Sequence, residues 1–153
     1  MQGESRGRDE LTEKRIMGKL EKLNHKMKRQ LAGKFQGGSP LSCVQAVSLH
    51  FIMTESRNGD VFTKDLEEFL DIKSSSATSL VNYLEKYGYI RREPLAEDGR
   101  YRRLVLTDRA RDIEPELNQT IDDYISGKFE GFTGEELAVL EFLLDKMMAN
   151  TSG

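Results

Sequence analysis

Small polar side chains gather on one predicted helix, between residues 74 and 86. The apolar residues of a single buried face recur there at helical spacing, at Ala77, Leu80, Val81 and Leu84. The opposite side carries hydroxyl, amide and ammonium groups, at Ser74, Ser75, Ser76, Thr78, Ser79, Asn82 and Lys86. Such groups can hydrogen-bond base edges or phosphates, and the amides of a helix N-terminus favour a phosphate. This helix therefore indicates nucleic-acid binding, although Ser74 or Ser75 could also serve only as its cap.

Arginine side chains cluster just after this helix, in a predicted β-hairpin. Arg100 follows Asp98 and Gly99 in the loop, and Arg102 and Arg103 begin the second strand. An arginine at a loop tip can enter a narrow minor groove of DNA, where the potential is most negative. Arginines in a hairpin can also be merely solvated, so the cluster indicates DNA binding only together with the helix that precedes it.

The elements that must position these residues follow a definite order. A short helix is predicted to follow Thr63 as its N-cap, and a tight connection at 71–73 leads to the polar helix. Two strands are predicted at 89–92 and 101–107. Two short helices joined tightly and followed by a hairpin with a basic loop describe a winged helix-turn-helix.

Further helices flank this central part. A narrow apolar stripe predicts a long helix from Leu11 to Phe35, ended by residues 37–40, and a mostly buried helix follows Ser42. Two more helices are predicted after Thr107, the last of them lined by leucine and methionine side chains. The predicted fold class is α+β, mostly α, in which a winged helix-turn-helix is joined to a helical platform.

Length, composition and charge limit the function classes. With 153 residues, the chain fits one domain with a helical appendage and is too short for most large barrel enzymes. No apolar run is long enough to span a membrane, and the single cysteine fits a reducing cytoplasm. The net charge of −3 hides a gradient, because residues 112–153 hold ten acidic and two basic side chains. Partners respond to local fields, so the overall charge does not exclude DNA.

No group of residues has the spacing of a catalytic or metal site. His25 and His50 lack the companions that a metal site needs, so we expect no metal and no cofactor. Neighbouring acids such as Asp122 and Asp123 diverge on a helix, so we expect no catalytic residue and no enzyme. Two alternatives stay open at this point. One is a winged-helix module that binds proteins without duplex DNA, and the other is a small hydrolase that uses Cys43 or a histidine such as His50. Redox sensing by Cys43 is a further reading of that thiol.

The joint pattern resembles the multiple-antibiotic-resistance regulator (MarR) family of transcription factors. Residues 63–72 and 84–90 carry this resemblance, together with the run 98–107, which holds an Asp, an Arg two residues later and a closing Leu-Thr. The resemblance covers roughly residues 11–149, and its specific part is 61–107. It implies a homodimeric repressor that binds a pseudo-palindromic operator in double-stranded DNA.

The resemblance also implies how the chain is divided. Residues 11–40 together with 108–149 would form the helical dimerisation region. Residues 41–107 would form the winged helix-turn-helix DNA-binding domain. Within it, the helix-turn-helix is expected at about 63–87 and the wing at about 89–107.

Individual roles follow from the same resemblance. Four recognition-helix residues would face the major groove: Ser75, Ser76, Ser79 and Asn82. Arg100 would enter the minor groove, and Asp98 would orient the wing arginines. A small aromatic or phenolic effector would bind between the platform and the winged domain, with a wall formed by Ile16, His50 and Met53.

Overall fold

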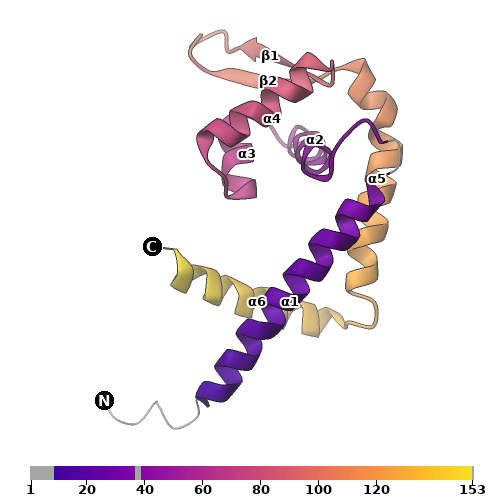
Figure 1. Cartoon of the computed structure of the whole chain (residues 1–153). Helices are drawn as coiled ribbons and strands as arrows, with labels where there is room; N and C mark the ends of the chain where they lie inside the picture. Colours follow the sequence, from indigo (N-terminus) through magenta and orange to yellow (C-terminus); the bar gives the residue numbers. More distant parts are fainter. Residues whose placement is uncertain (1–8, 37–38, 153) are drawn as a thin grey trace. The chain divides into compact units, whose positions relative to one another are not determined.

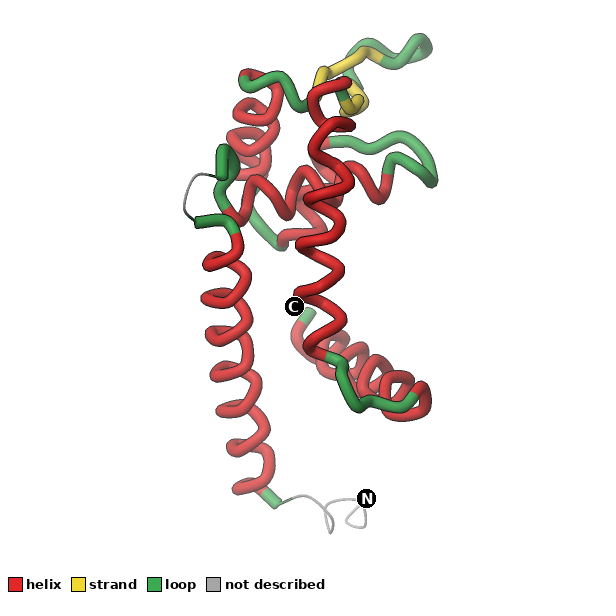
Figure 2. Tube along the Cα trace, turned by 90° about the vertical axis from the view of Figure 1, so that its right-hand side faces the viewer, coloured by secondary structure: helices red, strands yellow, loops and turns green. Residues whose placement is uncertain are grey.

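The computed structural model describes residues 9–36 and 39–152. In this part of the chain, six helices and one antiparallel hairpin follow one another in the predicted order, which confirms the mostly helical α+β fold class (Figure 1). Figure 2 shows how small the sheet is beside the helices. The elements are α1 (Glu10–Lys34), α2 (Cys43–Glu55), α3 (Thr63–Leu70), α4 (Ser74–Lys86), β1 (Ile90–Pro94), β2 (Arg102–Leu106), α5 (Asp108–Lys128) and α6 (Gly134–Thr151).

The chain forms two compact units, one ending at Asn118 and the other starting at Gln119. The first unit holds the main core, in which α2, α3, α4 and the hairpin pack together. Its most deeply buried side chains come from all of these elements and include Leu49, Ile52, Leu66, Val81, Leu84, Tyr89, Ile90 and Leu104. Burial of this apolar surface is the main force that fixes α4 and the hairpin in place.

A tight turn joins α3 to α4. Asp71 takes the left-handed conformation, with φ of 51°, and ends α3. The Ile72 N–H then donates to the Glu67 carbonyl over 3.2 Å, which closes the turn. Because Leu66 and Ala77 are completely buried, both helices are held against the core, and the opposite face of α4 stays in solvent.

The helix starts differ from the prediction at both helices of this pair. Thr63 and Ser74, predicted as caps, are the first residues inside α3 and α4. The cap positions are Phe62 and Lys73, and neither makes a side-chain cap hydrogen bond. Ser74 and Ser75 are exposed residues within α4, and neither occupies its N-cap position.

The hairpin is fixed to the core at its base. Its register pairs Ile90 with Leu106 and Pro94 with Arg102, so the strands are shifted slightly from the predicted 89–92 and 101–107. The Leu104 N–H donates to the Val61 carbonyl over 2.7 Å, which ties β2 to the segment before α3. The base of the wing therefore has a defined position beside the helix-turn-helix.

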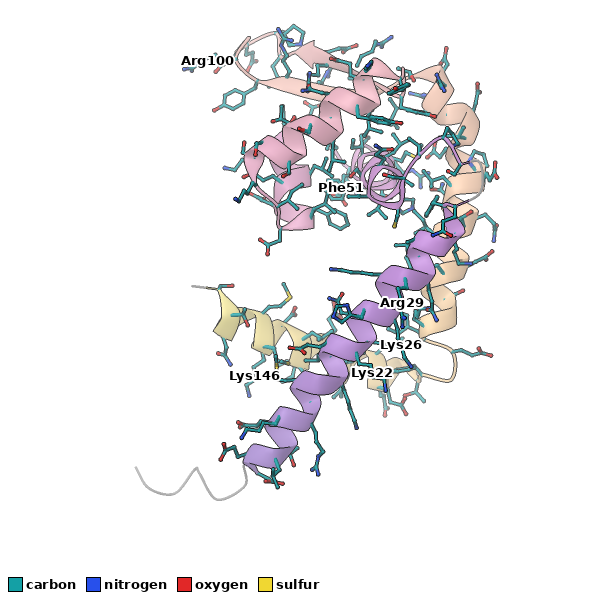
Figure 3. All side chains as sticks on the ribbon, in the orientation of Figure 1. Lys22, Lys26, Arg29, Phe51, Arg100 and Lys146 are labelled. Carbon is teal, nitrogen blue, oxygen red and sulfur yellow. The ribbon has the colours of Figure 1, made fainter. Side chains whose placement is uncertain are left out.

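Neither α1 nor α6 has a buried residue. On α1, Lys22, Lys26 and Arg29 lie along the helix (Figure 3). This helix ends at Lys34, and residues 37–38, predicted to help end it, lie outside the described residues. In the described part of the chain, no helix has the length and apolar character needed to cross a membrane.

Candidate nucleic-acid interface

A groove runs between the start of α3, the exposed face of α4 and the hairpin. We call it the wing groove, and its volume is about 610 Å³. Five residues singled out from the sequence line it: Ser74, Thr78, Asn82, Arg100 and Arg102. The sequence reasoning did not single out the other six: Phe62, Thr63, Lys64, Glu67, Arg92 and Tyr101. The groove thus brings helix and wing side chains, from parts of the chain about twenty residues apart, onto one surface.

Two rows of polar side chains run along α4. Ser74, Thr78 and Asn82, spaced by four residues, form the row that faces the wing groove. The remaining predicted residues of α4 are exposed but do not line the groove: Ser75, Ser76, Ser79 and Lys86. Together the two rows give α4 a polar surface that is wide enough to meet both base edges and backbone in a major groove.

Arg100 lies at the tip of the wing (Figure 3). Its side chain is 87% exposed, and its guanidinium donates to both carboxylate oxygens of Asp98, over 3.2 and 3.1 Å. The Arg100 backbone N–H donates to the same carboxylate over 3.0 Å. These hydrogen bonds hold the pKa of the Asp98 carboxyl below its ordinary value.

Arg102 and Arg103 point to opposite sides of β2, because successive residues of a strand alternate. Arg102 lines the wing groove. Arg103 donates to Glu93 over 3.1 Å and lies 3.5 Å from Asp60. These two carboxylates raise the pKa of the Arg103 guanidinium and neutralise its charge locally. The structure therefore does not bring Arg103 to the groove, where Arg102 and Arg100 lie.

Arg92 is the most informative residue that the sequence reasoning missed. It lies on β1, lines the wing groove, and donates to both Glu85 and Asn82 of α4. Successive side chains of a strand point to opposite faces of the sheet. Because Arg92 pairs with Leu104 in the hairpin, this alternation could have placed the Arg92 side chain on the same face as Leu104 and Arg102. Its partners on α4 could not be found that way, because they depend on how the hairpin packs.

Lys64 and Tyr101 are also additions from the structure. Lys64 is exposed in the first turn of α3, where nothing in the sequence distinguishes it from a solvated lysine. Tyr101 is exposed beside Arg100, and its ring meets Phe62 edge-on with the ring centroids 6.5 Å apart. The lining of the wing groove holds Lys64, three arginines and Glu67. Even with Glu85 and Asp98 paired to two of these arginines, the groove keeps a net positive charge in a chain whose overall charge is −3.

The three residues predicted for an effector wall occupy different environments. Met53 is 1% exposed in the core and His50 is half-buried on the same helix, α2. Ile16 is 45% exposed on α1. The wing groove includes none of these three residues, and their role as effector contacts stays a prediction.

Among the described residues, no three histidine, cysteine or carboxylate side chains come together as a metal site would need. Cys43 is the first residue of α2 and is partly buried. Burial raises the pKa of the Cys43 thiol. A reactive cysteine needs the opposite shift, so the geometry does not favour redox or nucleophilic chemistry at this position.

We expect Cys43 to react slowly with iodoacetamide at pH 7. Because only the thiolate attacks and the pKa is raised, the rate should climb as the pH rises beyond the ordinary thiol pKa. The measurement is the alkylation rate from pH 6 to 10, followed by mass spectrometry and compared with a peptide of residues 39–47. A rate for the protein that exceeds that of the peptide at pH 7 would be incompatible with this burial.

Residues 45–100, from α2 to the tip of the wing, match the model of the MarR family. Over 87% of its length the chain is similar to the transcription regulator MarR from Oenococcus oeni PSU-1, with 28% identity and a TM-score of 0.71. The similarity covers 98% of that chain.

Two solved structures with bound DNA share the fold. A mutant MarR from E. coli in complex with operator DNA is 24% identical, with a TM-score of 0.68, over 92% of this chain and 99% of that one. A mutant MepR from S. aureus bound to an oligodeoxyribonucleotide is 18% identical, with a TM-score of 0.56, over 90% and 98%. The winged helix-turn-helix and its flanking helices are thus matched along nearly their full length.

Proposed function

We propose, because the chain belongs to the MarR family of winged-helix transcription regulators, that it acts as a homodimeric repressor of a pseudo-palindromic operator. The observation that carries the proposal is the wing groove, which joins the polar row of α4 to Arg100 and Arg102 on the wing. A cytoplasmic location follows from this role, because the operator lies on the chromosome. Net positive charge between a helix and a wing suits the anionic backbone of duplex DNA.

In the complex, α4 enters the major groove of double-stranded DNA. Its hydroxyl and amide groups, at Ser75, Ser76, Thr78, Ser79 and Asn82, meet base edges and phosphates. Arg100 reaches into the neighbouring minor groove, and Asp98 fixes the direction of its guanidinium. Ser74, Arg102 and Lys86 contact the backbone, and the contacts with phosphates set the register on the duplex.

A second copy of the chain completes the molecule. Helix α6 is apolar on nearly every side and yet has no buried residue. Its exposed large side chains include Leu137, Val139, Phe142, Leu143, Leu144, Met147 and Met148. An exposed apolar surface of this extent marks an interaction site, and a homodimer that pairs residues 11–40 and 108–149 of two chains covers it.

A small aromatic or phenolic effector releases the repressor. Such a ligand binds better to a dimer geometry whose two α4 helices no longer match the spacing of the half-sites, and so shifts the population away from the DNA-bound form. Of the candidate contacts, Ile16 comes from α1, and His50 and Met53 come from α2 of the winged domain itself. A change of operator affinity on adding salicylate is a direct way to look for this coupling.

The experiment that tests the proposal is a fluorescence anisotropy titration with duplex DNA. We expect the protein to bind the DNA upstream of its own gene roughly 10³-fold more tightly than a random duplex of equal length. Raising the salt from 50 to 200 mM should weaken binding steeply, because Lys and Arg contacts release counterions from phosphates. Equal, weak affinity for both duplexes would favour the protein-interaction module instead.

A further inference from the structure

The charged side chains on one side of α1 are all basic. Their spacing alternates between four and three residues, so they follow one another along the helix, at Arg15, Lys19, Lys22, Lys26 and Arg29. All five are exposed, and the last three can be followed along α1 in Figure 3. The acidic residues of α1 fall on its other sides, because neighbouring positions of a helix point about 100° apart. We call this row the basic stripe.

The basic stripe has no counter-charge in the part of the chain that the structure describes. The ion pair within α1 joins Lys14 to Glu10 over 3.0 Å, and neither residue belongs to the stripe. No ion pair between described residues includes a member of the stripe. Like charges one helical turn apart repel each other, here along about 21 Å of helix. An acidic surface that covers the stripe would remove this repulsion.

An apolar row runs directly beside the basic stripe. Each of its residues follows a member of the stripe in the sequence, and none is buried: Ile16, Leu20, Leu23 and Met27. Ile16 is 45% exposed and Leu23 is 50% exposed. Phosphates of a nucleic acid would neutralise the stripe but would not bury the apolar row. The combination fits a protein surface that joins apolar to acidic side chains.

Helix α6 carries a surface of this kind. A groove along it, with a volume of about 370 Å³, is lined by five apolar side chains: Phe129, Leu137, Leu140, Leu144 and Met148. Glu141 and Asp145 line the same groove, one helical turn apart. Both are exposed, and neither takes part in an ion pair with another described residue. We call this surface the α6 groove.

We propose that α1 of one chain lies against the α6 groove of a second chain, with Lys22 and Lys26 facing Glu141 and Asp145. The inference rests on the proposed function, because it specifies which surfaces meet in the proposed homodimer. Both charged pairs are spaced by four residues, so each spans about 6 Å along its helix. Two-fold symmetry repeats the contact, which gives four charge pairs in a dimer. These pairs select the register, and burial of the apolar row stabilises it.

Charge reversal in two double variants of the full-length protein tests this pairing. Lys22→Glu with Lys26→Glu reverses the basic side, and Glu141→Lys with Asp145→Lys reverses the acidic side. Each variant alone should dimerise at least roughly 30-fold more weakly than the wild type, because all four pairs become repulsive. An equal mixture should form a heterodimer in which every pair again joins opposite charges. Sedimentation velocity with one variant fluorescently labelled measures both effects.

The control and a salt series separate pairing from folding and from net charge. Lys14→Glu with Lys28→Glu changes the charge of α1 by the same amount at two exposed positions outside the stripe, and it should dimerise as the wild type does. The wild-type dimer should weaken when sodium chloride rises from 50 to 500 mM, because salt screens exposed charge pairs. A dimer that is insensitive to this change would contradict the pairing without any substitution.

The possible results are distinct. If the wild-type protein is a monomer at micromolar concentration, the proposed homodimer itself fails. If it is a dimer and both reversed variants dimerise equally well alone, the two charged surfaces do not meet. If mixing restores nothing but one chain with all four substitutions dimerises, the pairing lies within a chain and the inference is wrong. If reversal of Lys22 and Lys26 leaves the dimer intact but weakens binding to duplex DNA, the stripe contacts phosphates instead.

Discussion

Replacing Phe142 with aspartate is expected to dissociate the proposed homodimer and to abolish tight operator binding. Phe142 is 64% exposed on α6, a helix without any buried residue in the single chain. Burying one phenylalanine side chain contributes about 1.5–3 kcal/mol, and a two-fold interface contains each residue twice. A carboxylate at that position must also lose its hydration if the interface forms. We therefore expect the dimer dissociation constant to rise by more than roughly 100-fold.

Sedimentation velocity at micromolar concentration measures this change directly. Asn150→Asp places the same charge near the end of α6, where the side chain is exposed, and serves as the matched control. The control should remain dimeric, and circular dichroism should show the helical content of both variants to be unchanged. Operator affinity should fall together with dimerisation, because each monomer reaches only one half-site. If the aspartate variant sediments as the wild-type dimer does, α6 is not the surface that joins the two chains.

Replacing Arg100 with alanine is expected to weaken operator binding by about 1–3 kcal/mol, or roughly 5- to 150-fold. The side chain is at the tip of the wing, and Asp98 holds its guanidinium in one direction before DNA arrives. A side chain fixed beforehand loses less conformational entropy on binding than a freely rotating one. The loss should be greatest for operators with A·T-rich flanks, where the minor groove is narrow.

Anisotropy titrations of Arg100→Ala against several flanking sequences check this prediction. Arg103→Ala is a useful comparison, because Arg103 is also a wing arginine but pairs with Glu93 and Asp60 away from the groove. Its effect on affinity should be smaller and should not depend on the flanks. An Arg100→Ala protein that binds every flank as the wild type does would remove Arg100 from the interface.

The order of elements in the winged helix-turn-helix could be predicted from local patterns. Apolar spacing located α4, and the residues that end a helix or turn a chain located its boundaries within a few positions. Gly88, which follows the last turn of α4, has φ of 80°, a left-handed conformation that glycine adopts readily at a helix end. Each of these features depends on residues close together in the sequence, so the sequence alone is enough to predict it.

The details of the site could not be predicted in the same way. Thr63 and Ser74 have side chains suited to a helix cap, yet each helix starts one residue earlier than that pattern indicates, with Phe62 and Lys73 at the caps. Successive side chains of β2 point to opposite faces, so Arg102 and Arg103 face different sides of the hairpin. The prediction that both arginines bind DNA did not take this alternation into account. The bonds of Arg92 to α4 arise from tertiary packing, which periodicity does not describe.

In the proposed complex, a symmetric dimer reads a repeated sequence through two copies of α4. The most direct measurement is selection by the purified protein from a library of random duplexes, followed by sequencing. We expect an inverted repeat whose half-site centres are about 10 base pairs, or one helical turn, apart. Enrichment of an unrepeated site, or of no sequence at all, would contradict a homodimer that binds a pseudo-palindromic operator.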